Sequence, residues 1–172
     1  MDLDLDVIGR SLPYLFNGLQ YTAQLTLVAA CGGVVFGTLL AMARLSSFAP
    51  LAMSVAGYVN LMRSVPLLLV IFWFYFLAPV LVQTVMGWER PPSIGAERSA
   101  YFTFIMFEAA YFCEIMRAGI QSIAKGQASA AHALGLNYWQ AMRLVILPQA
   151  FRNMLPVLLT QTIILFQDVS LV

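Results

Sequence analysis

The sequence predicts an all-α integral membrane protein, a bundle of four transmembrane helices with a helix–turn–helix loop on the cytoplasmic side. Of the 172 residues, 61% are hydrophobic and 10% are charged, whereas a soluble domain carries about 25% charged residues. The long gaps between charges can each hold about 20 apolar residues, the length of helix that crosses a bilayer. This composition excludes a soluble single domain, and it equally excludes a disordered chain.

The first two predicted spans fill the two longest apolar gaps. The first is expected at residues 18–43, in a stretch without a charged side chain. The second is expected at residues 65–86, where Pro66 suits the first helical turn and Pro79 predicts a kink. Residues 45–62 hold too many Ser, Gly and Asn residues for a span, so we expect a surface or short helix there.

The last two predicted spans contain ionisable residues. Residues 99–118 are apolar and helix-prone but include Glu108 and Glu114, and residues 153–172 include Asp168. An ionisable group within a bilayer is costly and usually faces a cavity. By helix rise, Glu108 lies about 14 Å from the cytoplasmic end of its span. We therefore expect Glu108 and Asp168 to line a substrate pathway. The alternatives are a buried Glu108 bonded to a neighbour and an Asp168 that makes a helix-end or interhelical bond.

Charge also predicts the orientation and excludes some partners. The acidic start of the chain does not fit a signal peptide, and basic residues favour the cytoplasmic side. An external N-terminus places six basic residues inside, namely Arg44, Arg63, Arg117, Lys125, Arg143 and Arg152. It leaves three outside, namely Arg10, Arg90 and Arg98. Nine basic against eight acidic residues provide no face for nucleic acid, and the two cysteines lie in apolar runs that suggest neither a disulfide nor a metal site.

The cytoplasmic loop, residues 119–148, is predicted to be a helical hairpin. Residues 122–134 are rich in alanine and favour a helix, and Gly135 stands where a left-handed residue would end it. Asn137 then offers an N-cap, with Gln140 completing a capping box.

The second helix of the hairpin is expected from residue 138 to about residue 146, ended by Pro148. Lys125 and Arg143 are the only fixed positive charges of the two helices. A compact, largely uncharged helical pair suits a groove in a partner protein.

Four small residues and one ion pair predict packing. Ala29, Gly33, Gly37 and Ala41 recur at every fourth position, a spacing that permits close approach of helices. Packing within the chain is the first expectation for them, and packing across a dimer is the second. Glu114 and Arg117 are three residues apart and are expected to pair on one helix face.

The loop resembles the signature loop of ABC importer permeases. The family pattern is Glu-Ala-Ala, three residues, Gly, nine residues, and Ile-x-Leu-Pro. The matching residues here are Ser129, Ala130, Ala131, Gly135, Val145, Leu147 and Pro148. Ser129 and Val145 depart from the pattern, and the spacing fits without a gap. The segments 63–68, 107–111, 114–120 and 167–171 also resemble the polar-amino-acid branch, above all its glutamate/aspartate permeases.

This resemblance implies a single transmembrane permease domain in a bacterial inner membrane. Family members have five spans, so we expect one further span beyond the apolar chain end at Val172. The resemblance implies an ATP-driven importer of polar amino acids, with a second permease subunit (identical or similar), separate ATPase subunits and an external solute-binding protein as partners. No phosphate-binding Gly-x-x-x-x-Gly-Lys-Ser/Thr loop occurs in the sequence. We therefore expect no enzyme and no cofactor in this chain, with ATP and Mg on the partner ATPase.

The candidate coupling residues follow from the same loop. They are Gln127, Ser129, Ala130, Ala131, Leu134, Gly135, Leu136, Leu147 and Pro148. Among them Ala130, Ala131 and Leu134 are expected to form the face that contacts the ATPase.

Two other classes of function compete with that of an ATP-driven importer. The first is a secondary transporter driven by an ion gradient, with Glu108 as its ion or proton site. It leaves the capped helical hairpin unexplained. The second, a membrane enzyme, lacks a nucleophile–base pair or metal cluster in the sequence.

Overall fold

The computed structural model describes residues 5–92 and 95–170, and every element in them is helical. The elements are α1 (Leu5–Arg44), α2 (Ala49–Ser64), α3 (Leu67–Phe72), η1 (Trp73–Leu77), α4 (Ala78–Met86), α5 (Ala96–Gln121), α6 (Lys125–Ala133), α7 (Tyr138–Ala141), η2 (Met142–Ile146) and α8 (Leu147–Val169). The η segments are π-helical. Asp2 and Asp4, which belong to the acidic start of the chain, and Val172 at its apolar end lie outside the described residues.

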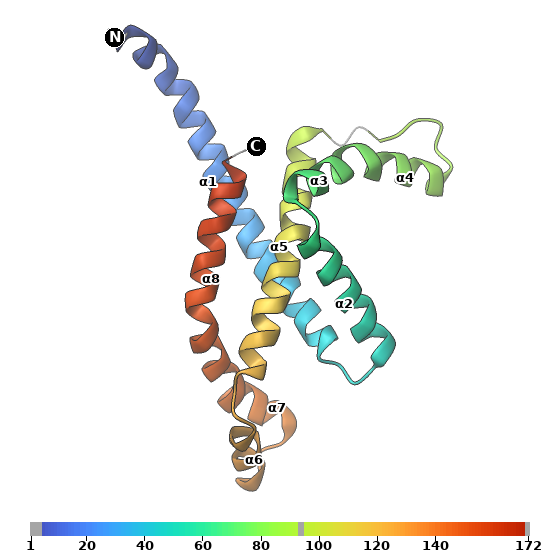
Figure 1. Ribbon diagram of the computed structural model, residues 1–172, viewed down its shortest axis with the longest axis vertical. Coiled ribbons are helices and arrows are strands. Elements are labelled where there is room, and N and C mark those ends of the chain that lie inside the picture. Colours follow the sequence, from blue (N-terminus) through green and yellow to red (C-terminus); the bar gives the residue numbers. More distant parts are fainter. Residues whose placement is uncertain (1–4, 93–94, 171–172) are drawn as a thin grey trace.

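Helix α5 is the centre of the bundle. It packs most extensively against α1 and also contacts α2, α3 and α8. In Figure 1, α8 runs beside α5, while α6 and α7 lie together at the lower end of the molecule. The loop helices therefore lie at the end of α5 where α8 begins.

The close contact between α1 and α5 depends on glycine. A Cβ atom added at Gly37 would lie 2.6 Å from Phe112 Cβ, and one at Gly33 would lie 2.8 Å from Phe112 Cδ2. Ala29 and Ala41, at the ends of the same ridge, are fully or nearly fully buried. Packing of the small residues within the chain is confirmed.

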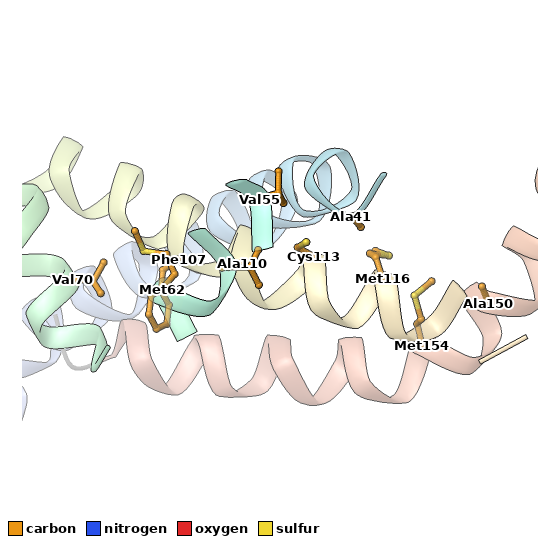
Figure 2. Packing of buried hydrophobic residues seen from close by; sticks show 11 residues of the cluster. Ala41, Val55, Met62, Val70, Phe107, Ala110, Cys113, Met116, Ala150 and Met154 are labelled. Carbon is orange, nitrogen blue, oxygen red and sulfur yellow. The ribbon is translucent and has the colours of Figure 1, made fainter. Parts of the chain in front are cut away.

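The buried side chains form two apolar clusters along α5. The larger joins α1, α2, α3, α5 and the first half of α8 (Figure 2), with members Ala41, Val55, Val59, Met62, Val70, Phe107, Ala110, Cys113, Met116, Ala150 and Met154. The smaller joins α1, α5 and the far end of α8, with members Leu25, Ala29, Ala100, Phe104, Leu165 and Val169. Large apolar side chains elsewhere are exposed, as a bilayer permits.

Within residues 5–92 and 95–170, two helical segments are long and apolar enough to cross a bilayer, namely Ser11–Arg44 and Leu67–Met86. The first contains the predicted span at 18–43, but α1 begins earlier, at Leu5, and continues through Pro13. Helices α5 and α8 occupy the other two predicted spans.

The segment before Pro66 differs from a simple surface helix. Helix α2 buries Val55, Val59 and Met62, and Tyr58 Oη donates a hydrogen bond to the Met106 carbonyl of α5 at 2.7 Å. The chain then turns at Val65, which is extended because a residue before proline disfavours helical angles. Beyond it, α3, η1 and α4 run sideways from the upper part of the bundle (Figure 1).

Pro79 and Pro148 share one local structure. Each follows a five-residue π-helical segment with a single residue between. The expectation that the second loop helix ends at Pro148 is wrong, because the helical path continues from α7 through η2 into α8. The Leu147 N–H bonds to the Met142 carbonyl, one residue further back than in an α-helix. This wider turn accommodates a proline that lacks an N–H.

Candidate functional site

The helical hairpin at the lower end is closed by Gly135. The Leu136 N–H donates to the Ala131 carbonyl at 3.1 Å, and the Gly135 N–H donates to the His132 carbonyl at 2.9 Å. These are the two bonds of a Schellman motif, with Gly135 left-handed at φ 80°. The predicted stop is confirmed, although α6 begins at Lys125 and not at residue 122.

The next helix begins with the predicted capping box. The Gln140 N–H donates to Asn137 Oδ1 and the Asn137 N–H donates to Gln140 Oε1, both at 3.0 Å. His132 Nδ1 lies 3.0 Å from the Leu136 carbonyl, so its ring closes the turn from the other side. Local hydrogen bonds alone therefore fix the angle between α6 and α7.

Three of the residues expected to contact the ATPase, Ala130, Ala131 and Leu134, differ in their exposure. Leu134 is 83% exposed, and Gln127, Ser129 and Ala130 are exposed as well. Ala131, in contrast, is 1% exposed, because it faces inward where the Schellman bonds close the hairpin. It is unsuitable as a contact for a partner.

Further members of the hairpin surface come from its second half. Leu147 and Pro148 are exposed, and Leu136 is half-buried. Tyr138, Trp139 and Leu144 are exposed too, and sequence reasoning did not select them. The sequence could have indicated them, because they are large apolar residues on a helix predicted to lie at the surface.

One contact fastens the hairpin to α8, and two more join α8 to the end of α5. Gln149 Nε2 of α8 donates to Gln127 Oε1 of α6 at 3.2 Å. Asn153 Nδ2 of α8 donates to Oγ of Ser122, the C-cap residue of α5, at 2.9 Å. Gly119 of α5 leaves space for the side chain of Met154 of α8, which a Cβ atom would overlap. The hairpin is therefore held to α8, which is itself held to the end of α5.

Two open clefts lie along the face between the end of α2, α5 and α8. The first, about 530 Å³, is lined by Arg63, Tyr111, Glu114, Ile115, Ala118, Gly119, Ser122, Asn153, Met154, Val157 and Gln161. The second, about 380 Å³, is lined by Arg63, Ser64, Val65, Pro66, Leu67, Phe107, Tyr111, Gln161, Ile164 and Asp168. Arg63, Tyr111 and Gln161 line both, so the two clefts adjoin, and we call their common wall the cleft face.

Arg63 stands out on this face. Its guanidinium carbon lies 5.4 Å from the centre of the Tyr111 ring, a cation–π geometry. Tyr111 lies well inside α5, so Arg63 contacts the side of that helix and not its end.

Glu108 does not line either cleft. Its side chain is 1% exposed, and its two carboxylate oxygens accept hydrogen bonds from Gln161 Nε2 at 3.2 and 3.1 Å. The expectation that Glu108 faces a pathway is therefore corrected: α1 covers it at Gly33, and Gln161 separates it from the cleft face. Asp168, half-buried, lines the second cleft.

Glu114 is held by two arginines. Arg44 Nη1 lies 2.5 Å from Glu114 Oε2, and Arg117 pairs with both oxygens of the same carboxylate. The predicted Glu114–Arg117 pair is confirmed, and Arg44 joins the end of α1 to it. Of this cluster only Glu114 lines the first cleft, and the two guanidinium groups behind it offset its negative charge.

The described part of the chain holds no cluster of side chains suited to a metal ion. No group of three or more His, Cys, Asp or Glu side chains there could hold an ion.

Comparison with known proteins identifies the family of this arrangement. A family model described as binding-protein-dependent transport system inner membrane component matches residues 33–172. The chain is 54% identical over 171 residues to the glutamate/aspartate import permease protein GltK of Escherichia coli O157:H7, covering 99% of this chain and 76% of GltK. It is 33% identical over 172 residues to the arginine transport system permease protein ArtQ of Bacillus subtilis, covering 75% of that protein. A crystal structure of an amino acid ABC transporter with histidines matches with a TM-score of 0.84 and 31% identity, over 99% of this chain and 76% of that one.

Proposed function

Since the chain belongs to the family of binding-protein-dependent transport system inner membrane components, we propose that it is the permease subunit of an ATP-driven importer of glutamate and aspartate. The observation that carries the substrate is the 54% identity to GltK over 99% of the chain. The chain supplies the pathway across the membrane, and a separate ATPase subunit supplies the energy.

Arg63 on the cleft face supports an acidic substrate. The first cleft is lined by Arg63 and by Glu114, whose charge is offset by Arg44 and Arg117, whereas Asp168 lines the second cleft. Glutamate and aspartate each carry one net negative charge at neutral pH, so the arginine favours their binding in the first cleft. Arg63 is the group that can bind a carboxylate in a bidentate manner.

The hairpin supports coupling to an ATPase subunit. Its exposed residues Leu134, Tyr138 and Trp139 form an apolar tip that fits a groove in a protein partner. Because one hydrogen bond links α6 to α8 and another links α8 to the end of α5, a shift of the docked hairpin moves the helices that line the clefts. In this proposal the candidate coupling residues act through their shape, with Gly135 and Pro148 setting the path of the chain.

The proposed topology has an external N-terminus and four crossings, made by α1, by the segment from α2 to α4, by α5 and by α8. The hairpin then lies in the cytoplasm beside the ATPase. A second permease subunit completes the pathway, and an external solute-binding protein delivers the amino acid. Binding of ATP and Mg is assigned to the ATPase subunit, and this chain performs no catalysis.

The test is uptake of radiolabelled glutamate by the complete complex in proteoliposomes. We expect uptake only with ATP on the ATPase side and binding protein on the opposite side, and no response to a proton or sodium gradient. Uptake driven by an ion gradient in the absence of ATP would contradict the proposal and favour a secondary transporter. The burial of Glu108 offers such a gradient no exposed carboxylate at that position.

A further inference from the structure

The amide of Gln161 has a defined orientation on the cleft face. Gln161 Nε2 donates to both oxygens of Glu108 at 3.2 and 3.1 Å. The amide group is planar and its nitrogen and oxygen diverge, so the oxygen Oε1 is directed away from Glu108. Among the described residues no donor binds Oε1, and Gln161 borders both clefts. An unused carbonyl acceptor is therefore available to a ligand.

Glu108 determines which way this amide turns. The carboxylate is an acceptor only, so it selects the nitrogen of Gln161 and rejects the oxygen. Its own position leaves little freedom, because the side chain is 1% exposed and a Cβ atom at Gly33 would lie 2.9 Å from Glu108 Cβ. A neutral amide at this position would accept Gln161 in either orientation.

We infer that Glu108 is a positioning residue, which turns the carbonyl oxygen of Gln161 toward the clefts to receive the ammonium group of the amino acid. The inference rests on the proposed function and adds the group that recognises the α-amine. An acceptor oxygen suits this task, because an ammonium group has donors only. Arg63, on the same face, takes a carboxylate.

The experiment compares two ligands that differ in the amine. The purified permease–ATPase complex, without the binding protein, is placed in nanodiscs, and the Kd values of L-glutamate and of glutarate are measured. Glutarate has both carboxylates but no ammonium group. We expect the wild type to prefer glutamate about tenfold, the size of one hydrogen bond to a charged group.

Two single variants separate the acceptor from the group that orients it. Gln161→Leu removes the acceptor and is expected to abolish the preference while Glu108 stays intact. Glu108→Gln is expected to reduce it by about threefold or more, since the amide of Gln161 can then turn. Gln167→Leu is the matched control, an exposed glutamine of the same helix that borders neither cleft, and it should keep the full preference.

The exchange variant Glu108→Gln with Gln161→Glu gives the sharpest test. The amide at position 108 then donates to the carboxylate at position 161, whose second oxygen faces the clefts as an acceptor. We expect the preference for glutamate over glutarate to return, a rescue that a merely structural role of Glu108 would not produce. Assembly of each variant is checked by co-purification of the ATPase subunit and by its basal ATP hydrolysis.

Three results would overturn the inference. They are a wild-type preference in Gln161→Leu, a wild-type preference in an assembled Glu108→Gln complex, and a failure of the exchange to restore preference in an assembled complex. If Glu108→Gln alone does not assemble, the exchange variant decides. Failure of the proposed function is seen separately, as a wild-type complex that shows no ATP-driven glutamate uptake.

Discussion

Gly135 and Ala131 show how single residues define the hairpin. Gly135 has a φ of 80°, which a residue with a Cβ atom rarely adopts. Ala131 supplies the carbonyl that accepts the Leu136 N–H, and its small side chain is buried inside the turn. The exposed tip at Leu134 is therefore a consequence of the turn that these two residues make.

Changing Gly135 tests whether this turn is needed for coupling. Gly135→Val is expected to strain the turn by about 1–2 kcal/mol, to weaken co-purification of the ATPase subunit and to abolish uptake. Gly135→Asn is the control, because asparagine enters the left-handed region more readily, and it should retain most activity. Normal co-purification and uptake in Gly135→Val would contradict the role of the turn.

Neighbouring alanines on α6 test the direction of the hairpin's contact face. Ala130 is exposed and Ala131 is buried. A cysteine in place of Ala130 should crosslink to the ATPase subunit, whereas one in place of Ala131 should react poorly and give little crosslink. Crosslinking is measured on gels after oxidation with cysteines in the partner. Stronger crosslinking from position 131, or crosslinking of position 130 to the external binding protein, would overturn the proposed docking.

At the scale of elements, the packing of α1 on α5 is the most extensive helix contact of the described residues. Phe112 lies against both Gly33 and Gly37, so two glycines allow α1 to approach the aromatic side of α5. The salt bridge from Arg44 to Glu114 at 2.5 Å then fixes the end of α1 to the same helix. We expect α1 and α5 to move together.

Two glycines in helices provide a matched test of that contact. A Cβ atom at Gly37 would lie 2.6 Å from Phe112 Cβ and 2.9 Å from the Cys113 backbone nitrogen, whereas one at Gly57 in α2 meets nothing within 4 Å. Gly37→Ala should destabilise the protein by about 1–3 kcal/mol. Gly57→Ala should stabilise it by up to about 1 kcal/mol, because alanine favours a helix. Thermal unfolding in detergent measures both, and equal effects would contradict the contact.

At the scale of the whole molecule, local features were predictable and distant pairings were not. Gly135, Asn137 and Gln140 could be placed from the sequence because their bonds join residues a few positions apart. The bond between Glu108 and Gln161 joins residues 53 positions apart, and nothing in either local sequence predicts it. An ionisable residue in an apolar helix indicated a polar site but not which of its neighbours faces the cleft.

The path of the chain after Pro66 had the same limit. Hydropathy identified residues 65–86 as apolar enough to span a bilayer, and it favoured a surface position for residues 45–62. It could not indicate that α2 buries Val59 and Met62 against the bundle, because those residues are too few to raise the mean hydropathy of a stretch rich in serine and glycine. Tertiary packing decided the arrangement.

The central claim, that an acidic amino acid passes along the cleft face, is tested most directly by substrate selectivity at Arg63. ATP-driven uptake of glutamate and of glutamine is measured with the complete complex in proteoliposomes, for the wild type, Arg63→Gln and Arg63→Lys. Arg63→Gln is predicted to reduce glutamate uptake about tenfold, because the side-chain carboxylate of glutamate loses its positive partner. Glutamine uptake should fall far less. Arg63→Lys should restore part of the glutamate uptake, since lysine keeps the charge but not the bidentate geometry. Unchanged selectivity in an assembled Arg63→Gln complex would contradict the assignment of the cleft face to the substrate.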